Sequence, residues 1–481
     1  MAEYKCSICG YVYDEESEGT LWDDLGNDWA CPMCGVDKSL FDKKEKTITT
    51  QSSNKQKDAM KPQASDSTGD MNLEEYLKDW EKSSDPHETQ MNDIHKMAKT
   101  GDSVMEPMRT TKPLISWNDV LIKGAQLARL PLDKNDQVTT ETVIGVNAKH
   151  PLIIKTPVII SHMSFGALSR EFKEALATGS AAANTAICSG EGGILPEELN
   201  AAYKYIFEYV PNEYSVSEEN LKRVDAIEIK IGQGVKPGMG GHLPGEKVTK
   251  EIAEIRGKEI GKDIHSPSSF KDIRNEEELR QKIDWLREKS GGKPVGVKIA
   301  AGDIENDLAV ILAGNPDFIT IDGRGGATGS APKFVKDNTT VPTLFALYRA
   351  KEFLMKNNRN DIAIIITGGL RMSGDFAKAI ALGATAVAIA TAAMIAGGCQ
   401  QFRICNSGNC PVGIATQDPE LRKRLDIAKS AKRIENYLNA TTHELEAFAR
   451  LTGHHDIHEL TLDDLCTTNS EISNHTKIKH V

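Results

Sequence analysis

The 481-residue sequence predicts an α/β protein: a (β/α)8 TIM barrel preceded by a small metal-binding domain. Beyond Thr156, eight short runs rich in β-branched residues alternate with longer helical patterns. Glycines gather at the carboxyl ends of several of these runs, where ligands approach the backbone of a barrel. Two CxxC pairs lie near the N-terminus. A doubly wound open sheet would alternate similarly, so the strand count alone leaves that architecture open.

Composition divides the chain into four segments. The stretch KTITTQSSNKQKDAMKPQASDSTGD has almost no large apolar residue, which predicts a flexible linker. In the following NLEEYLKDWEK, apolar residues recur at three- and four-residue spacing, which predicts a helix. The expected segments are a metal domain at 1–45, the linker at 46–70, a helical lead-in at 71–152 and the barrel at 153–481.

The eight expected strands follow in chain order. The second ends in GEGG, the fourth in GQGVKPGMGGHLPG, the sixth in GRGGATG and the seventh in GGLR. These glycines predict that the ligand site lies at the carboxyl ends of the strands. The runs are 158–163, 185–189, 205–210, 226–231, 295–300, 318–322, 362–367 and 386–391.

Charge and hydropathy exclude several classes of function. Hydrophobic residues make up 39% of the chain, which excludes disorder along its whole length. No stretch approaches the roughly 20 apolar residues of a bilayer span, and no secretory signal opens the sequence, so we expect no membrane partner and a cytoplasmic location. Residues 1–45 carry 11 acidic side chains against 4 basic ones, within a net charge of −11. Such a surface disfavours nucleic acid and favours a basic protein partner.

The first cysteine group consists of Cys6, Cys9, Cys31 and Cys34, in CSICG and CPMCG. Two CxxC turns can place four thiolates tetrahedrally about one ion, and the glycines permit the turns. On spacing alone, a structural zinc site and an iron site both remain open.

Aromatic residues around this group narrow the choice. Six of them, with the acidic surface, are unlike a nucleic-acid-binding zinc ribbon: Tyr4, Tyr11, Tyr13, Trp22, Trp29 and Phe41. The pattern resembles rubredoxin over about residues 1–45, with a shortened middle loop. The resemblance implies a mononuclear iron on the four cysteines and one-electron transfer.

The second cysteine group lies in an expected loop at 397–417, with Cys399, Cys405 and Cys410. Three thiolates in one glycine-containing loop can ligate three corners of an iron-sulfur cluster, and three reduced loop thiols are the alternative. Two further cysteines stand alone. Cys188 ends an apolar strand, where packing is favoured over a nucleophile, and Cys466 is expected to be a core or incidental residue.

Several motifs together resemble the flavin-binding synthase domain of glutamate synthase, over about residues 80–470. They are MSFGALS, SGEGG, IKIGQGVKPGMGGHLPG, TGGLR and the cysteine loop, in the same order. With rubredoxin in front, the match is to the short, archaeal-type members. The resemblance implies an FMN barrel with a [3Fe-4S] cluster on the second cysteine group. It also implies the reaction: 2-oxoglutarate and ammonia condense to 2-iminoglutarate, which is reduced to L-glutamate.

Cofactor positions come partly from the residues and partly from the resemblance. Gly368 and Gly369, supported by Gly325 and Gly326, follow the seventh and sixth strands, where barrels commonly bind phosphate. Lys298 lies inside the apolar run VGVKIA and needs an anion. The resemblance places it beside the N1 and C2 oxygen edge of the flavin, and a structural ion pair is the alternative.

The backbone at Met163 and Ser164 would face the flavin N5 edge by the same resemblance. A dicarboxylate substrate requires fixed positive charge. Lys236 and Arg256 match family positions near the carboxylates, although a surface role for Arg256 remains open.

Polar positions of the same pocket match at Gln233 and Glu191, and Glu191 could transfer protons. We therefore expect Glu191, Gln233 and Lys236 to be catalytic, and Lys236, Arg256, Gln233 and His242 to bind substrate.

Three departures from the long glutamate synthases point to altered substrate contacts. His242 stands where they carry Gln, Cys188 and Ser189 replace Asn-Thr, and Arg324 and Gly325 replace His-Asp. The alternatives are the same cofactors acting on a related imine or N-substituted glutamate, a non-catalytic electron-transfer subunit, or a zinc-binding interaction protein.

The expected supply of ammonia and electrons follows from two further features. The chain begins with rubredoxin where large glutamate synthases carry a glutaminase domain, so ammonia is expected from solution or from a separate glutaminase subunit. No GxGxxG opens a βαβ unit, so direct NAD(P)H binding is not expected. Electrons should come from a separate reductase or a ferredoxin, and their order of flow is open.

Overall fold

The computed structural model describes residues 2–6, 11–26, 29–32, 36–44 and 84–481. Contacts divide the chain into two compact units, Met1–Val104 and Met105–Val481. The linker expected at 46–70 and the helix expected in NLEEYLKDWEK lie outside the described residues.

The first unit contains a three-stranded antiparallel sheet in the order β2-β1-β3. The expected aromatic residues form a small core over it, where Tyr4 stacks on Trp22 at 4.3 Å between ring centroids and Phe41 lies 4.9 Å from Trp22. The elements are β1 (Glu3–Cys6), β2 (Val12–Asp14), α1 (Glu15–Glu18), η1 (Trp22–Asp24), η2 (Lys38–Leu40), β3 (Phe41–Lys44) and α3 (Met91–Thr100).

The second unit is built on a closed barrel of eight parallel strands, in the order β10-β13-β14-β15-β16-β7-β8-β9. Each of the eight predicted runs overlaps one strand, with β9 beginning one residue before its run, and pairing of β16 with β7 closes the barrel. The prediction is therefore confirmed and the open sheet is excluded. The strands are β7 (Val158–Ile160), β8 (Ala186–Cys188), β9 (Lys204–Tyr209), β10 (Ala226–Lys230), β13 (Val295–Ala300), β14 (Phe318–Asp322), β15 (Ala363–Thr367) and β16 (Ala386–Ile389).

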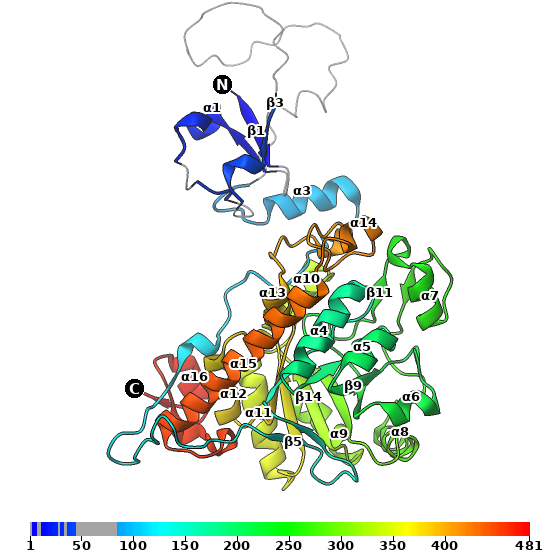
Figure 1. Ribbon diagram of the computed structural model, residues 1–481, viewed down its shortest axis with the longest axis vertical. Coiled ribbons are helices and arrows are strands. Elements are labelled where there is room, and N and C mark those ends of the chain that lie inside the picture. The colour runs from blue at the N-terminus through cyan, green and yellow to red at the C-terminus, as the bar shows by residue number, and fades with distance from the viewer. Residues whose placement is uncertain (1, 7–10, 27–28, 33–35, 45–83) are drawn as a thin grey trace, which may run out of the picture. The chain divides into compact units, whose positions relative to one another are not determined.

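Helices surround this barrel (Figure 1). Capping residues start several of them: the Ser169 hydroxyl accepts the Phe172 N–H before α4, and the Asn275 side chain accepts the Glu278 N–H before α8. The helices between strands include α4 (Arg170–Ala182), α5 (Pro196–Ala201), α6 (Glu218–Arg223), α8 (Glu276–Lys289), α9 (Ile304–Ala313), α10 (Lys333–Asn338), α11 (Thr343–Lys356), α12 (Ser373–Ala381) and α13 (Thr391–Gly397).

A long excursion separates β10 from α8. It contains β11 (His242–Leu243), η4 (Gly245–Lys247), α7 (Lys250–Arg256) and β12 (Ile264–His265). β11 and β12 pair antiparallel, with His242 opposite His265.

The long C-terminal helix α15 (Ile427–Thr452) packs against α4. A Cβ at Gly179 would lie 2.7 Å from the Ala431 carbonyl oxygen, so only glycine allows this approach. The remaining elements are η3 (Trp117–Asp119), β4 (Val120–Ile122), η5 (Cys405–Ser407), α14 (Pro419–Arg422), η6 (Ile457–Glu459), η7 (Leu462–Asp464), β17 (Leu465–Thr467), α16 (Ser470–His475) and β18 (Lys479–His480).

The two ends of the barrel differ in chemistry. The hairpin of β5 (Thr142–Ile144) and β6 (Leu152–Ile154) joins an apolar cluster with residues at the amino-terminal ends of the strands, such as Phe318 and Ala386. Glycine-rich loops follow the carboxyl ends. The opening to a ligand is therefore at the carboxyl end of the barrel.

The segment predicted as a helical lead-in is less helical than expected. Of its described part, only α3 is an α-helix, and residues 105–152 run mainly as loops and short strands. Prolines, including Pro107 and Pro113, interrupt helix formation there. The buried Lys336 ammonium donates to the carbonyls of Glu106 and Met108, which fixes the start of this segment. Among the described helices, none combines the length and apolarity that crossing a bilayer requires.

Candidate active site

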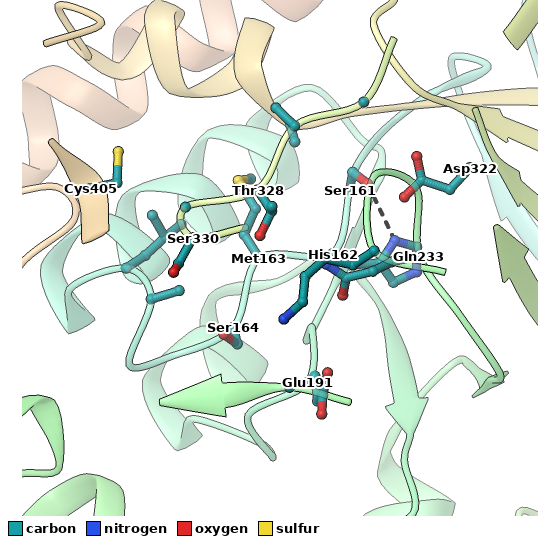
Figure 2. Close-up of a pocket in the computed structure, with 18 of the residues that line it drawn as sticks. Ser161, His162, Met163, Ser164, Glu191, Gln233, Asp322, Thr328, Ser330 and Cys405 are labelled. Atoms are coloured by element: carbon teal, nitrogen blue, oxygen red, sulfur yellow. Dashed lines mark hydrogen bonds between the residues drawn. The ribbon is translucent and has the colours of Figure 1, made fainter. Parts of the chain in front are cut away.

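One pocket at the carboxyl end of the barrel brings together every site residue predicted for this unit outside the cysteine loop. Cys405 of that loop also lines it. In Figure 2, Cys405 lies on one side of the pocket, and His162, Gln233 and Asp322 lie on the other. The predicted residues found there are Met163, Ser164, Glu191, Gln233, Lys236, His242, Arg256, Lys298, Gly325, Gly326, Gly368 and Gly369.

A buried ion pair forms part of the pocket wall. Lys298 is only 2% exposed, and its ammonium lies 3.1 Å from Glu208 Oε1. Burial opposes the charge on Lys298, yet Glu208, Glu228 and Asp322 raise its pKa. Burial would raise the pKa of Glu208, but Lys298, Lys230 and His162 lower it to about 2. The ion pair considered as an alternative for Lys298 is therefore present, on a side chain that also lines the pocket.

Further charged side chains of the barrel interior were missed by the sequence reasoning. The His162 imidazole contacts the Glu228 carboxylate through Nε2, Glu228 also accepts a hydrogen bond from Thr320, and all three are buried or nearly so. The signal that singled out Lys298, a charged residue inside an apolar strand, also applies to Glu208, Glu228 and Lys230.

Glu191 and Lys236 lie on the loops after β8 and β10. Glu191 is ion-paired with Lys230; burial would raise its pKa, but Lys230 lowers it. The half-buried Lys236 ammonium makes no hydrogen bond or ion pair with any described residue. Burial and then repulsion by Lys230 lower the Lys236 pKa. The pocket therefore holds an ionised carboxylate and a cation that lacks an anion.

Arg256 is buried, so the surface role left open for it is wrong. Its Nη2 donates to the Phe165 carbonyl at 2.7 Å, and its guanidinium lies 5.4 Å from the centre of the Tyr214 ring. Its Nε is buried without a hydrogen-bond partner among the described residues. Burial lowers the Arg256 pKa. The unused donor makes Arg256 a second candidate for binding an anion.

Four glycines lie in the two neighbouring loops that follow β14 and β15, and we call them together the glycine turn. Gly368 and Gly369 have φ of 116° and 94°, which disfavours side chains. A Cβ at Gly325 would lie 2.4 Å from the Gly368 carbonyl oxygen, which in turn accepts the Thr343 hydroxyl at 2.6 Å. A side chain at Gly325, Gly368 or Gly369 would collide with backbone of the neighbouring loop, so glycine lets the two loops lie against each other in the pocket wall.

The three cysteines of the second group lie close enough for their charges to interact. Burial, followed by Cys399 and Cys410, raises the pKa of Cys405 to about 11. Among the described residues, two groups of three ligand side chains have all their ligand atoms within 4.8 Å of one another, and neither includes a cysteine. The sulfurs of Cys399, Cys405 and Cys410 therefore do not all lie within 4.8 Å of one another.

Lys247 connects this loop to the pocket. Its largely buried ammonium donates to the Cys405 carbonyl at 2.9 Å, and its side chain lines the pocket beside Asn406. Burial lowers the pKa of Lys247, although Cys405 and Glu246 act in the opposite direction. A buried cation beside thiols favours an anionic group in this loop.

Two of the other positions that differ from the long glutamate synthases, Arg324 and Cys188, lie outside the pocket lining. Arg324 donates to the carbonyls of Asp337 and Thr339 and does not line the pocket. Cys188 is buried, and burial raises its pKa well above the ordinary value, which favours packing over nucleophilic chemistry. Cys466 is buried in β17.

In the first unit, Cys6 and Cys31 are buried. Their backbone N–H groups donate to the carbonyls of Tyr11 at 2.7 Å and Val36 at 2.8 Å. The other two predicted ligands, Cys9 and Cys34, lie outside the described residues.

Comparison with known proteins places both units in families. Residues 87–455 match the family model of the conserved region in glutamate synthase, and residues 3–41 match that of rubredoxin. A glutamate synthase large subunit-like protein of Rhizobium meliloti is 35% identical over 79% of this chain and 90% of its own length. The archaeal glutamate synthase [NADPH] of Methanocaldococcus jannaschii is 38% identical over 76% of this chain and 78% of its own.

Among solved structures, a lactate oxidase of Pediococcus acidilactici is similar at a TM-score of 0.48 and 17% identity, over 73% of this chain and 84% of its own. This 17% identity is lower than the 35% and 38% identity to the two glutamate synthase relatives. The chain is therefore an oxidoreductase that belongs to the glutamate synthase family and carries a rubredoxin domain at its N-terminus.

Proposed function

We propose that this protein binds FMN and a [3Fe-4S] cluster in the barrel and a mononuclear iron in the rubredoxin domain, and reduces 2-iminoglutarate, formed from 2-oxoglutarate and ammonia, to L-glutamate. The observation that carries the proposal is the single pocket that joins the glycine turn, the Lys298–Glu208 pair, two incompletely partnered cations and the cysteine loop. These features fit a flavin, a dicarboxylate and a redox cluster in one site.

Two parts of the pocket suit FMN, one its phosphate and the other its ring. The turn of Gly325, Gly326, Gly368 and Gly369 would hold the phosphate, because it presents backbone where side chains would clash. Lys298 would lie at the edge of the ring that becomes negative, with Met163 and Ser164 at the opposite edge. When bound, FMN supplies hydride to an acceptor held over it.

Lys236 and Arg256 bind the two carboxylates of the substrate, because both offer donors that no described residue satisfies. Gln233 orients the substrate from the same loop as Lys236. Glu191 is ionised at neutral pH, since Lys230 lowers its pKa. It passes one proton from the attacking ammonia nitrogen to the carbonyl oxygen as the carbon–nitrogen bond forms. It then passes a second proton from that nitrogen to the resulting hydroxyl group, which leaves as water.

The soft thiolate set of Cys399, Cys405 and Cys410 fits an iron-sulfur cluster. The rubredoxin match supports iron at Cys6, Cys9, Cys31 and Cys34. Electrons come from a separate reductase or ferredoxin, and ammonia from solution or a separate glutaminase subunit.

The test begins with anaerobic purification and analysis of flavin and metal. We expect one FMN and four irons per chain, three in the cluster and one in the rubredoxin domain. The protein is then supplied with 2-oxoglutarate, ammonium and chemically reduced ferredoxin, and L-glutamate is measured. NADPH without a reductase should give no product. A folded protein with neither flavin nor iron, and with none restored on reconstitution, would refute the proposal.

His242 favours one alternative, an N-substituted amine as co-substrate. It is an exposed side chain that lines the pocket, where long glutamate synthases carry Gln. Replacing ammonium by methylamine in the same assay distinguishes the two, because the alternative predicts a higher kcat/KM for methylamine. Bound FMN that is reduced without forming product from either amine would instead indicate an electron-transfer subunit.

A further inference from the structure

The hairpin of β11 and β12 carries two histidines and an aspartate at the rim of the pocket. His242 and His265 are cross-strand partners, and their rings stack 4.5 Å apart at an angle of 1°. Asp263 Oδ2 lies 2.8 Å from His242 Nε2 and 3.9 Å from His265 Nε2. All three side chains are exposed, and their ligand atoms lie within 4.8 Å of one another. One carboxylate oxygen therefore already faces both imidazoles.

These distances suit a transition-metal ion. Zinc binds imidazole nitrogen at about 2.0–2.1 Å and carboxylate oxygen at about 2.0–2.2 Å, so neighbouring ligand atoms in a tetrahedral site lie about 3.4 Å apart. The two separations of 2.8 and 3.9 Å lie on either side of that value. Binding would replace the His242–Asp263 hydrogen bond and would require rotation of the exposed imidazoles out of their parallel stack, so that both nitrogens point to the ion. The cross-strand pairing already holds the two imidazoles together.

The carboxylate is also held in place. Asp263 Oδ1 accepts the backbone N–H of Gly245 at 2.7 Å, which leaves Oδ2 directed at the histidines. Such a second contact orients a ligating carboxylate. Two imidazoles and one carboxylate suit zinc, cobalt or nickel, whereas magnesium and calcium favour sets made wholly of oxygen.

We propose that His242, Asp263 and His265 bind one divalent transition-metal ion, such as Zn²⁺, at the rim of the pocket. Three protein ligands leave a coordination position for water. The ion would join β11 to β12 and restrain the loop that begins at Gly241, where a Cβ would lie 2.6 Å from Glu191 Oε1. The site does not depend on the proposed reaction, because binding needs only the hairpin.

The test uses the full chain as isolated, with its own iron, in equilibrium dialysis against Zn²⁺ with metal analysis by mass spectrometry. We expect the wild type to bind one more zinc per chain than His242→Gln/His265→Gln. His265→Gln and Asp263→Asn should each weaken this binding at least about tenfold. His475→Gln is the matched control, because His475 is also exposed, with Glu471 3.7 Å away. It should bind zinc like the wild type.

Iron content is measured in every sample, so that zinc replacing iron at the cysteines is counted separately. Hydrogen exchange measured by mass spectrometry gives a second readout: Zn²⁺ should slow exchange in peptides spanning 240–266 of the wild type and not of the double variant. Equal zinc uptake by the wild type and the double variant, at equal iron content, would overturn the proposal. An equal loss in His475→Gln would do so as well.

Discussion

Replacing Lys298 by methionine tests the buried charges of the pocket directly. The substitution removes the ammonium and leaves the Glu208 carboxylate, 1% exposed in its side chain, without its nearest cation. Lowering the pKa of Glu208 from 4.5 to about 2 corresponds to about 3 kcal/mol of stabilisation. Removing one partner of a buried pair typically costs about 3–5 kcal/mol. We therefore expect Lys298→Met to lower the free energy of unfolding by about 3 kcal/mol.

The assay is urea unfolding under anaerobic conditions, followed by far-ultraviolet circular dichroism, which reports mainly on the helices of the barrel. Adding Glu208→Gln to Lys298→Met should recover at least half of the loss, since no unpaired carboxylate then remains. Lys222→Met is the control, because Lys222 forms an exposed pair with Glu218 at 2.7 Å. It should cost less than about 1 kcal/mol.

The pH dependence gives an independent check. A carboxylate whose pKa is lowered on folding stabilises the protein above its unfolded pKa, about 4.5, and loses that effect as the pH falls toward about 2. The difference between the wild type and Lys298→Met should therefore narrow below about pH 4.5. A loss of under 1 kcal/mol in Lys298→Met at neutral pH, or no recovery in the double variant, would refute the reasoning.

Three further substitutions probe the rest of the site. Gly368→Ala would place its Cβ 2.7 Å from the Gly323 backbone at a positive φ, and should lower FMN content at least tenfold, whereas Gly374→Ala, with its nearest contact at 3.9 Å, should keep it. Lys247→Met should lower the midpoint potential of the cluster, measured by redox titration with electron paramagnetic resonance. Lys247 Nζ lies 2.9 Å from the Cys405 carbonyl oxygen, so loss of its charge should lower the potential by on the order of 100 mV, and the exposed Lys250→Met should leave the potential unchanged. Lys236→Met should raise the KM for 2-oxoglutarate about 10–100-fold with FMN content unchanged; an unchanged KM would remove Lys236 from the substrate site.

The sequence by itself predicted the eight strands and the general place of the site, whereas the pairing of β16 with β7 was needed to exclude an open sheet. The eight strands could be predicted because each is a short β-branched run ended by turn residues, a pattern that depends on neighbours in the chain. The glycines after 318–322 and 362–367 likewise predicted a ligand site at these loops. This was possible because the conformational freedom of glycine is a local property. Residues 105–152 were predicted less well, because prolines such as Pro107 and Pro113 interrupt helix formation and the helical pattern before them does not continue through this stretch.

Only the tertiary structure decided which charges meet. Glu208 and Lys298 are 90 residues apart in the chain, and they meet because parallel pairing in the barrel aligns β9, β10 and β13. The local sequence RGK could not show whether Arg256 is exposed or buried. Its guanidinium is buried by contacts with Phe165 and Tyr214, which are distant in the chain. His265 lies in no motif of the sequence, and only the pairing of β11 with β12 places it opposite His242. Local patterns fix elements, whereas pairs distant in sequence are fixed by how those elements close on one another.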